Sequence, residues 1–410
     1  MTISADIITL SDLEADPHPA LARLRADAPV CWVPALGTWV VTGYQLAVGV
    51  LRDARTFTVD DPRFSTAKVV GPSMLSLDGA RHARHRGPFG PAFRPERIQA
   101  RLASFTRAEA GRLVSAIRPR GRAELRRAVA GPLAVAVMAE ALGLGNTDPA
   151  QILAWYDGIV AAVQAEAARA AGAPPGGPSP AAGPGRDDPV DPAAPTADSP
   201  GASAFAELAA SLRAVIAARQ PASLLAEAAG PLTEAEAISD AAVLMFGGIE
   251  TTEGMITNAV LHLLSHPGQL GLVLADRGLI PAAIEESLRL EPAAAVVDRY
   301  ATRDTRLGGA DIQAGDQVTV SIAGANRDPA VFRDPDRFDI GRPDAGRHLA
   351  FAHGPHFCLG AHLARLEACV AVDTLLALPR LRLDPRLPSA PRGLVFRKPP
   401  DLQACWDPDP

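Results

Sequence analysis

The sequence predicts a mainly α-helical fold with small β-sheets. Apolar side chains recur at helical spacing in many segments of the 410-residue chain. The longest such segment begins at Thr233, which forms a capping box with Glu236, and runs to about Ser265. At about 1.5 Å per residue this helix spans roughly 50 Å, enough to cross a whole domain. Alternating apolar residues at 30–42 and 308–320 indicate two β-hairpins.

The remaining helices are expected in chain order from the same periodicity and from flanking proline and glycine. An amphipathic helix covers residues 11–28, and a last helix follows Cys358 and stops at Leu378, before Pro379. Between them, helices are predicted over residues 47–52, 78–93, 98–117, 131–143, 149–171, 203–219, 222–228 and 281–292.

Two segments do not read as regular structure. Residues 56–78 form mostly loop, yet they carry many apolar side chains, and long loops of this kind inside compact chains are usually functional. Residues 172–201 are crowded with proline and glycine and hold one larger aliphatic residue, Val190. Such a stretch buries too little apolar surface to offset the entropy of ordering, so we expect a mobile linker or a domain boundary.

Composition excludes several classes of protein. A net charge of −6 and a pI near 5.9 argue against nucleic acid as the main partner. The chain has no uninterrupted apolar run of membrane-spanning length, and its first residues are acidic where a signal peptide would be basic, which predicts a cytoplasmic protein that does not bind membranes. The cysteines, at positions 31, 358, 369 and 405, show no paired spacing, so a disulfide framework is not expected.

The most informative stretch runs from Phe351 to Gly360 and places Cys358 after a Gly/Pro-rich segment and just before a helix. A helix N-terminus favours the anionic form of a thiol, and the thiolate is the form that binds metals. Gly354 and Gly360 would let the backbone turn around the sulfur and approach a flat group, so haem with Cys358 as axial ligand is the simplest occupant. Zinc is the alternative, with His353 and His356 as further ligands.

The centre of the long helix contains Gly247, Gly248, Glu250 and Thr251, which is poor local helix chemistry. Violations of this kind inside a consistent element tend to mark function. The glycines permit close approach of a flat group, and the Thr251 hydroxyl can compete for a backbone carbonyl. The alternative is a glycine pair that serves only close helix packing.

Two charged pairs are ambiguous from the residues alone. His82 and Arg86 share one face of a basic helix and suit a carboxylate or phosphate, or they belong to a solvated basic stripe. Glu286 and Arg289 are three residues apart and can form an ion pair, which would contribute under about 1 kcal/mol at a surface.

The stretch Phe351–Gly360 resembles the haem-thiolate signature of the cytochrome P-450 family, Phe-Gly-x-Gly-x-His/Arg-x-Cys-x-Gly. Ala352 departs from it, because glycine is usual there. Residues 247–251 resemble the oxygen-activation motif of that family, and the match recurs from about Asp12 to Trp406. The resemblance implies a single domain over residues 1–410, a triangular prism in which haem b lies between the long central helix and the helix after the cysteine. It also makes residues 172–201 a flexible lid loop over the substrate entrance.

The resemblance assigns roles residue by residue. Glu250 and Thr251 would deliver protons to dioxygen, while Glu286, Arg289 and Arg342 would form a buried scaffold. The residues implied to hold the haem are Cys358 as metal ligand, His82, Arg86, Arg299 and His356 toward the propionates, and Gly247, Gly248 and Phe351 around the ring. The tail at Gly393–Phe396 would insert a turn into the substrate pocket.

The implied activity is hydroxylation of a medium or large hydrophobic molecule, in secondary metabolism. A monomer would use O2 and electrons from an iron-sulfur ferredoxin and its NAD(P)H reductase, because no reductase-like segment follows Trp406. Oxidative coupling, epoxidation, demethylation or nitration are alternatives, as is a haem protein that binds a ligand without turnover. The expected pocket residues are mostly small and apolar: Val69, Val70, Met74, Leu75, Met245, Gly248, Ile249, Ala294, Ala295, Val296, Val395 and Phe396.

Overall fold

The computed structural model describes residues 5–171, 200–219 and 223–407. Its helices are α1 (Leu10–Ala15), α2 (His18–Asp27), α3 (Tyr44–Arg52), α4 (Ser65–Val70), α5 (Gly79–Arg86), α6 (Pro95–Ile117), α7 (Gly131–Leu142), α8 (Pro149–Ala171), α9 (Pro200–Ala218), α10 (Leu224–Ala228), α11 (Glu234–Ser265), α12 (Pro267–Ala275), α13 (Ile280–Leu290), α14 (Ile322–Ala325) and α15 (Ala361–Leu375). Its strands are β1 (Val30–Val33), β2 (Thr38–Val41), β3 (Phe57–Thr58), β4 (Arg122–Glu124), β5 (Val296–Ala301), β6 (Thr305–Leu307), β7 (Ala310–Ile312), β8 (Gln317–Ser321), β9 (Arg382–Leu383) and β10 (Gln403–Cys405).

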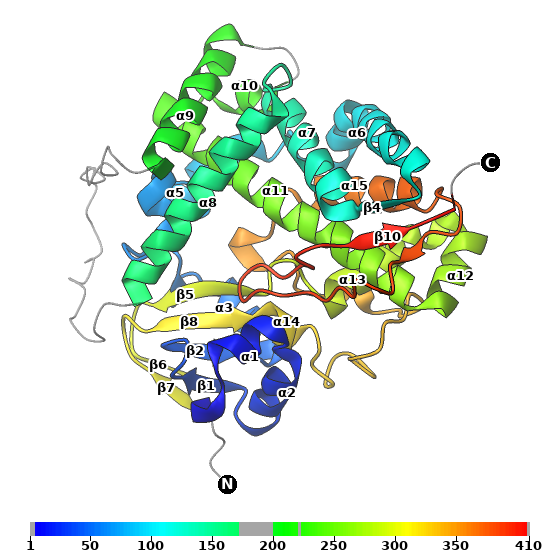
Figure 1. The fold of residues 1–410 in the computed structure, drawn as a ribbon. Coiled ribbons are helices and arrows are strands. Elements are labelled where there is room, and N and C mark those ends of the chain that lie inside the picture. The colour runs from blue at the N-terminus through cyan, green and yellow to red at the C-terminus, as the bar shows by residue number, and fades with distance from the viewer. Residues whose placement is uncertain (1–4, 172–199, 220–222, 408–410) are drawn as a thin grey trace.

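Helix α11 is the central element, and it crosses the middle of the molecule (Figure 1). The capping box predicted at its start is present, because Thr233 and Glu236 exchange hydrogen bonds between side chain and backbone. Apolar side chains on several of its faces enter one large core, which they share with α6, α7, α8, α13 and α15. A helix that is buried this extensively takes its stability from packing and therefore tolerates two adjacent glycines.

The strands form small sheets, the largest of which lies below α11 in Figure 1. Its order is β1-β2-β8-β5-β3, with β2 and β8 parallel and the other neighbours antiparallel. The predicted hairpin over 30–42 is confirmed as β1 and β2. The second prediction needs correction. Gly308 and Gly309, both with positive φ, connect β6 to β7, whereas β8 pairs with β2 and β5.

Three other predicted segments differ from the elements that the structure shows. The single helix predicted over 11–28 is two helices, because Pro17 lacks the amide hydrogen needed to continue α1 and instead begins α2. The loop over 56–78 contains the short elements β3 and α4. Helix α15 ends at Leu375, three residues before the predicted end, and its last residues continue as turns.

The predicted lid at 172–201 falls on residues that lie, except for Pro200 and Gly201, outside the described part of the chain. Pro200 and Gly201 begin α9. Within the described residues, the window Gly201–Ala218 of α9 is long and apolar enough to cross a membrane by length and composition. A single window of this kind is weak evidence, since core helices of soluble proteins pass the same test.

Candidate active site

Cys358 lies in a tight loop between two helical turns. Its backbone N–H donates to the Phe351 carbonyl at 2.8 Å, and the Phe357 N–H donates to the Gly354 carbonyl at 3.1 Å. Helix α15 begins at Ala361, three residues after the sulfur. The sequence-based placement of the cysteine before a helix N-terminus is therefore confirmed.

The electrostatics of the free thiol differ from the expectation. Burial raises the pKa of Cys358, and the Gly360 amide and the charges of Arg86 and Arg365 lower it by less. A lowered thiol pKa was expected from the helix N-terminus alone, but desolvation of the charged form is the larger effect here. Burial therefore disfavours the free thiolate at this position, and a bound metal cation would offset that effect.

The two glycines of the loop have different roles. Gly354 has φ +71°, and an added Cβ would lie 2.4 Å from the Leu51 carbonyl oxygen, so glycine is required because the loop packs against α3. Gly360 has an ordinary φ of −81°. The expectation that both glycines turn the backbone around the sulfur is thus wrong for Gly360.

Ala352, where the family motif has glycine, adopts φ +58°. A side chain in this left-handed region costs roughly 1–2 kcal/mol relative to glycine. We therefore expect Ala352→Gly to raise the free energy of unfolding by about 1 kcal/mol, measured by urea denaturation. Ala364→Gly in α15 is the control and should lower it by about 1 kcal/mol. A loss of stability in both variants would contradict the strain at Ala352.

A cluster of imidazole and guanidinium groups lies beside the cysteine loop. His356 Nε2 lies 2.9 Å from Asp78 Oδ1, and the His82 and His356 rings are 4.3 Å apart between centroids. Arg86 of α5 donates to the Phe357 carbonyl at 2.6 Å. Arg299 of β5 is buried and donates to the Asp298 carbonyl at 2.7 Å. The charge of Asp78 raises the pKa of both His82 and Arg299 against the effect of burial, so the structure brings together the four residues predicted to bind propionates.

One polar atom of this cluster is left for a ligand. Burial would raise the pKa of Asp78, but hydrogen bonds from His356, Thr58 and the Val59 amide outweigh it and lower that pKa to about 2. Burial, together with the positive charges of His356 and Arg86, lowers the pKa of His82 to about 4. His82 Nε2 is buried and has no hydrogen-bond partner among the described residues. A buried imidazole nitrogen without a partner, with the Arg86 charge acting on the same ring, is a polar position that a carboxylate ligand would satisfy.

Gly247 and Gly248, in the middle of α11, have different surroundings. An added Cβ on Gly247 would meet nothing within 4 Å, whereas one on Gly248 would lie 2.4 Å from Met138 Sδ of α7. Gly247 therefore leaves open space, while Gly248 serves helix packing, which was the alternative for this pair. The Thr251 hydroxyl donates to the Gly247 carbonyl at 2.6 Å, as expected for a hydroxyl that competes for the helix backbone.

Glu250 is engaged by partners from two other elements. Its Oε1 lies 2.7 Å from Lys398 Nζ, and its other oxygen accepts from the Tyr156 hydroxyl of α8. Lys398 also contacts Glu253, which receives Arg126 Nε at 3.0 Å. Burial and the charge of Glu250 raise the pKa of Tyr156, so the phenol stays protonated and acts as donor. The predicted proton-delivery acid is thus held in a largely buried ionic network.

Glu286, Arg289 and Arg342 meet as expected. The Glu286 and Arg289 side chains are fully buried, and Arg289 donates to both carboxylate oxygens, at 2.7 and 2.8 Å. Arg342 Nε donates to Glu286 Oε1 at 3.1 Å. Arg289 also donates to the backbone carbonyls of Asn326, Pro335 and Arg337. The pair therefore connects α13 to the segment that leads into the cysteine loop.

The predicted pocket residues occupy different environments. Val69, Val70, Met74, Met245 and Ile249 are buried in one core cluster, against which Leu75 packs. Phe396 stacks edge-on against Phe246 at 5.7 Å, and Ala294 forms a bridge with Phe396. Ala295 packs instead against Leu21 and Ala323, and with Val296 it lines a small cavity of about 30 Å³ beside α1 and α2. Val395 is 45% exposed. The prediction that Ala295 lines the substrate pocket is therefore corrected, because Ala295 has a structural role.

Comparison with known proteins identifies the family. A family model described as Cytochrome P450 matches residues 273–406. The cytochrome P450 monooxygenase PikC of Streptomyces venezuelae is 35% identical over 91% of this chain and 86% of its own length. The chain belongs to the cytochrome P-450 family. A vitamin D(3) 25-hydroxylase of Pseudonocardia autotrophica is 33% identical over 88% of this chain and 86% of its own length.

The fold is that of the same family. The crystal structure of P450BioI in complex with an acyl carrier protein ligated to hexadec-9Z-enoic acid superposes with a TM-score of 0.82 and 29% identity, covering 97% of this chain and all of that one. The protein is thus a cytochrome P-450 monooxygenase that binds haem b through a cysteine thiolate. It uses an organic substrate, O2 and redox partners, as this family does.

The observed residues fit this cofactor. The unpartnered His82 Nε2 and the buried Arg299 suit its carboxylates, Gly247 leaves room on one side, and Cys358 supplies sulfur. The zinc alternative fails, because no group of three metal-ligating side chains comes together among the described residues. Arg52 contacts His353 Nε2 at 3.0 Å, and His356 contacts Asp78.

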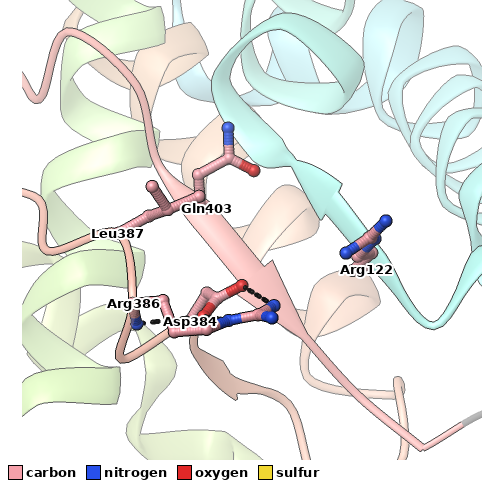
Figure 2. Close-up of a pocket in the computed structure, with 5 residues that line it drawn as sticks. All are labelled: Arg122, Asp384, Arg386, Leu387 and Gln403. Atoms are coloured by element: carbon pink, nitrogen blue, oxygen red, sulfur yellow. Dashed lines mark hydrogen bonds and ion pairs between the residues drawn. The ribbon is translucent and has the colours of Figure 1, made fainter.

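A surface cleft of about 420 Å³ lies apart from these residues, at the sheet β4-β10-β9 (Figure 2). It is lined by Arg122, Asp384, Arg386, Leu387 and Gln403, and Asp384 pairs with Arg386 at 2.9 Å. The lining of the cleft shares no residue with the predicted site.

Sequence reasoning missed Asp78, Tyr156, Lys398 and Arg365. Neither Tyr156, within the predicted helix over 149–171, nor Lys398, one of two lysines in the chain, was given a role. The rarity of lysine could have drawn attention to position 398. Nothing local pairs it with Glu250, which is 148 residues away in the sequence.

Proposed function

We propose that this cytochrome P-450 hydroxylates a medium or large hydrophobic molecule of secondary metabolism. The supporting observation is that Met245 and Ile249, two residues before and after Gly247 in α11, belong to one apolar cluster with Val69, Val70 and Met74, which contributes no charge. A site of this character selects by shape and apolar area. The names of two similar proteins agree with it, since one is a vitamin D(3) 25-hydroxylase and the other was crystallised with a carrier-bound fatty acid.

Within this proposal, Cys358 ligates the haem, and His82, Arg86, Arg299 and His356 hold its carboxylates. Bound haem supplies activation of dioxygen, which thiolate donation promotes. The protein must then supply protons. Thr251 lies one helical turn after Gly247, and its hydroxyl donates to the Gly247 carbonyl. This hydrogen bond competes with the backbone hydrogen bond of the helix to the same carbonyl, so a water molecule can enter the helix there.

Glu250 is the proposed source of these protons. Its carboxylate is bound by Lys398 and Tyr156 in the described arrangement. Delivery to the region of Thr251 therefore requires Glu250 to exchange at least one of these contacts for water. Because the pKa of Tyr156 is raised, the phenol keeps its proton and only holds the carboxylate in place, so the protons reach Glu250 from the water that replaces one of these contacts.

We further propose that the enzyme is a cytoplasmic monomer served by an iron-sulfur ferredoxin and its NAD(P)H-dependent reductase. A substrate library screened for the low-spin to high-spin absorbance change would identify ligands, and product formation with a surrogate ferredoxin would establish the reaction. Absence of any oxygenated product from every ligand that changes the spin state would contradict the proposed hydroxylation.

The role of Thr251 is tested by Thr251→Ala. The variant is expected to keep its haem but to release most of the consumed electrons as hydrogen peroxide, because proton delivery becomes misdirected. The measurement is the ratio of product to NAD(P)H consumed. Thr257→Ala, which removes a hydroxyl bonded to the backbone further along the same helix, is the control and should keep the wild-type ratio. A tightly coupled Thr251→Ala enzyme would remove Thr251 from this role.

A further inference from the structure

A second ionic cluster lies next to the cysteine loop, between α13 and α15. Arg365 donates to both carboxylate oxygens of Glu285, at 2.6 Å from Nε and 2.9 Å from a terminal nitrogen. The two side chains are 31% and 22% exposed, so the pair is partly shielded from water. A two-pronged contact of this kind fixes the orientation of the guanidinium as well as its position.

His348 supports the same carboxylate. Its Nδ1 accepts the Ala350 N–H at 3.1 Å, so the ring proton is on Nε2, which lies 3.3 Å from Glu285 Oε2 without forming a hydrogen bond. The His348 side chain is 1% exposed. Although burial would raise the pKa of Glu285, contacts with Arg365 and His348 lower it to about 2. Glu285 is therefore a firmly ionised anchor for Arg365.

The anchored guanidinium lies over Phe351, with Cζ 4.5 Å from the ring centroid. The carbonyl of that same residue accepts the N–H of Cys358 at 2.8 Å. The cation is thus placed against the residue to which the cysteine loop is bonded.

We propose that Arg365 is a positioning residue that sets the electron-donor strength of the thiolate, and that Glu285 and His348 hold it in place. A fixed cation stabilises the thiolate and favours the reduced haem, because reduction adds a negative charge to the site. The inference rests on thiolate ligation of the haem by Cys358. Its failure is distinguishable from failure of that ligation, because a protein without thiolate ligation would lack the red-shifted absorption band in every form.

The test compares holoenzyme variants by redox titration. Arg365→Gln is expected to shift the midpoint potential to more negative values and to lose the red-shifted band of its reduced carbon monoxide complex faster than wild type. Arg365→Lys, which keeps the charge but loses the two-pronged contact, should shift the potential less, in the same direction. Arg84→Gln is the control, because Arg84 makes a similar two-pronged contact with Glu236 between α5 and α11, and its potential should equal that of wild type.

A purely structural role gives a different result. Arg365→Gln would then unfold at lower urea concentration while its midpoint potential stayed equal to those of wild type and Arg84→Gln, and this outcome would overturn the proposal. If Arg365→Gln does not retain haem, Arg365→Lys decides, and an unshifted potential in that variant is the contradicting result.

Discussion

Replacing Cys358 with serine is expected to abolish the red-shifted absorption band that the reduced carbon monoxide complex of this family shows. The band depends on thiolate donation, and a serine hydroxyl is not ionised near neutral pH and is a poor ligand for haem iron. Burial makes the effect complete, since the same desolvation that raises the pKa of Cys358 would oppose an alkoxide even more strongly. The measurement is the difference spectrum of the reduced protein with and without carbon monoxide.

The matched control is Cys369→Ser, eleven residues further along, in α15. Cys369 lies within α15 and not in the cysteine loop, so it has no part in ligation. The control variant should keep the band at full intensity. An unchanged band in Cys358→Ser, or its loss in Cys369→Ser, would make the assignment of the axial ligand untenable.

Removing Arg289 has the largest expected effect on stability. Arg289→Met leaves the fully buried Glu286 carboxylate without its two-pronged partner and removes the Arg289 donor from the Asn326 and Pro335 carbonyls, while the Arg337 carbonyl still accepts from Arg342. Breaking a buried pair from one side typically costs about 3–5 kcal/mol. Because the pair connects α13 to the chain before the cysteine loop, the variant should also lose haem during purification. Urea denaturation and the ratio of haem to protein absorbance measure the two effects.

Helix α6 offers a control with the same spacing. Arg112 makes a two-pronged contact with Glu109, three residues earlier, but its side chain is 65% exposed. Arg112→Met should therefore change the free energy of unfolding by less than about 1 kcal/mol. Equal losses in the Arg289 and Arg112 variants would show that burial of the first pair contributes nothing.

Much of the fold could be predicted because its signals are local. The capping box at Thr233 and the helix over 149–171 were read within a few residues of sequence, and both are present. The errors occurred where a local pattern was compatible with two arrangements. Residues 317–320 alternate like half of a hairpin, but their partners are β2, far earlier in the chain, and β5. A single strand pattern does not encode its partner.

Some features of the candidate site could likewise be predicted from local sequence, and others could not. Cys358, Thr251 and the pair Glu286 and Arg289 could be found from residue types and short spacings. The environment of each one could not, because Glu250 meets Tyr156 across 94 residues and Arg365 meets Glu285 across 80. The raised pKa of Cys358 is likewise a result of burial, which local sequence does not express.

The sequence alone determined the helical class, the cysteine loop and the threonine of the central helix, since each depends on residues within about one or two helical turns. Only the tertiary structure decided that Gly248 makes room for Met138, that Lys398 forms an ion pair with Glu250 and that the Arg365 guanidinium lies over Phe351. The physical reason is that packing and charge depend on distance in space, and chain folding brings together groups that no sequence spacing relates.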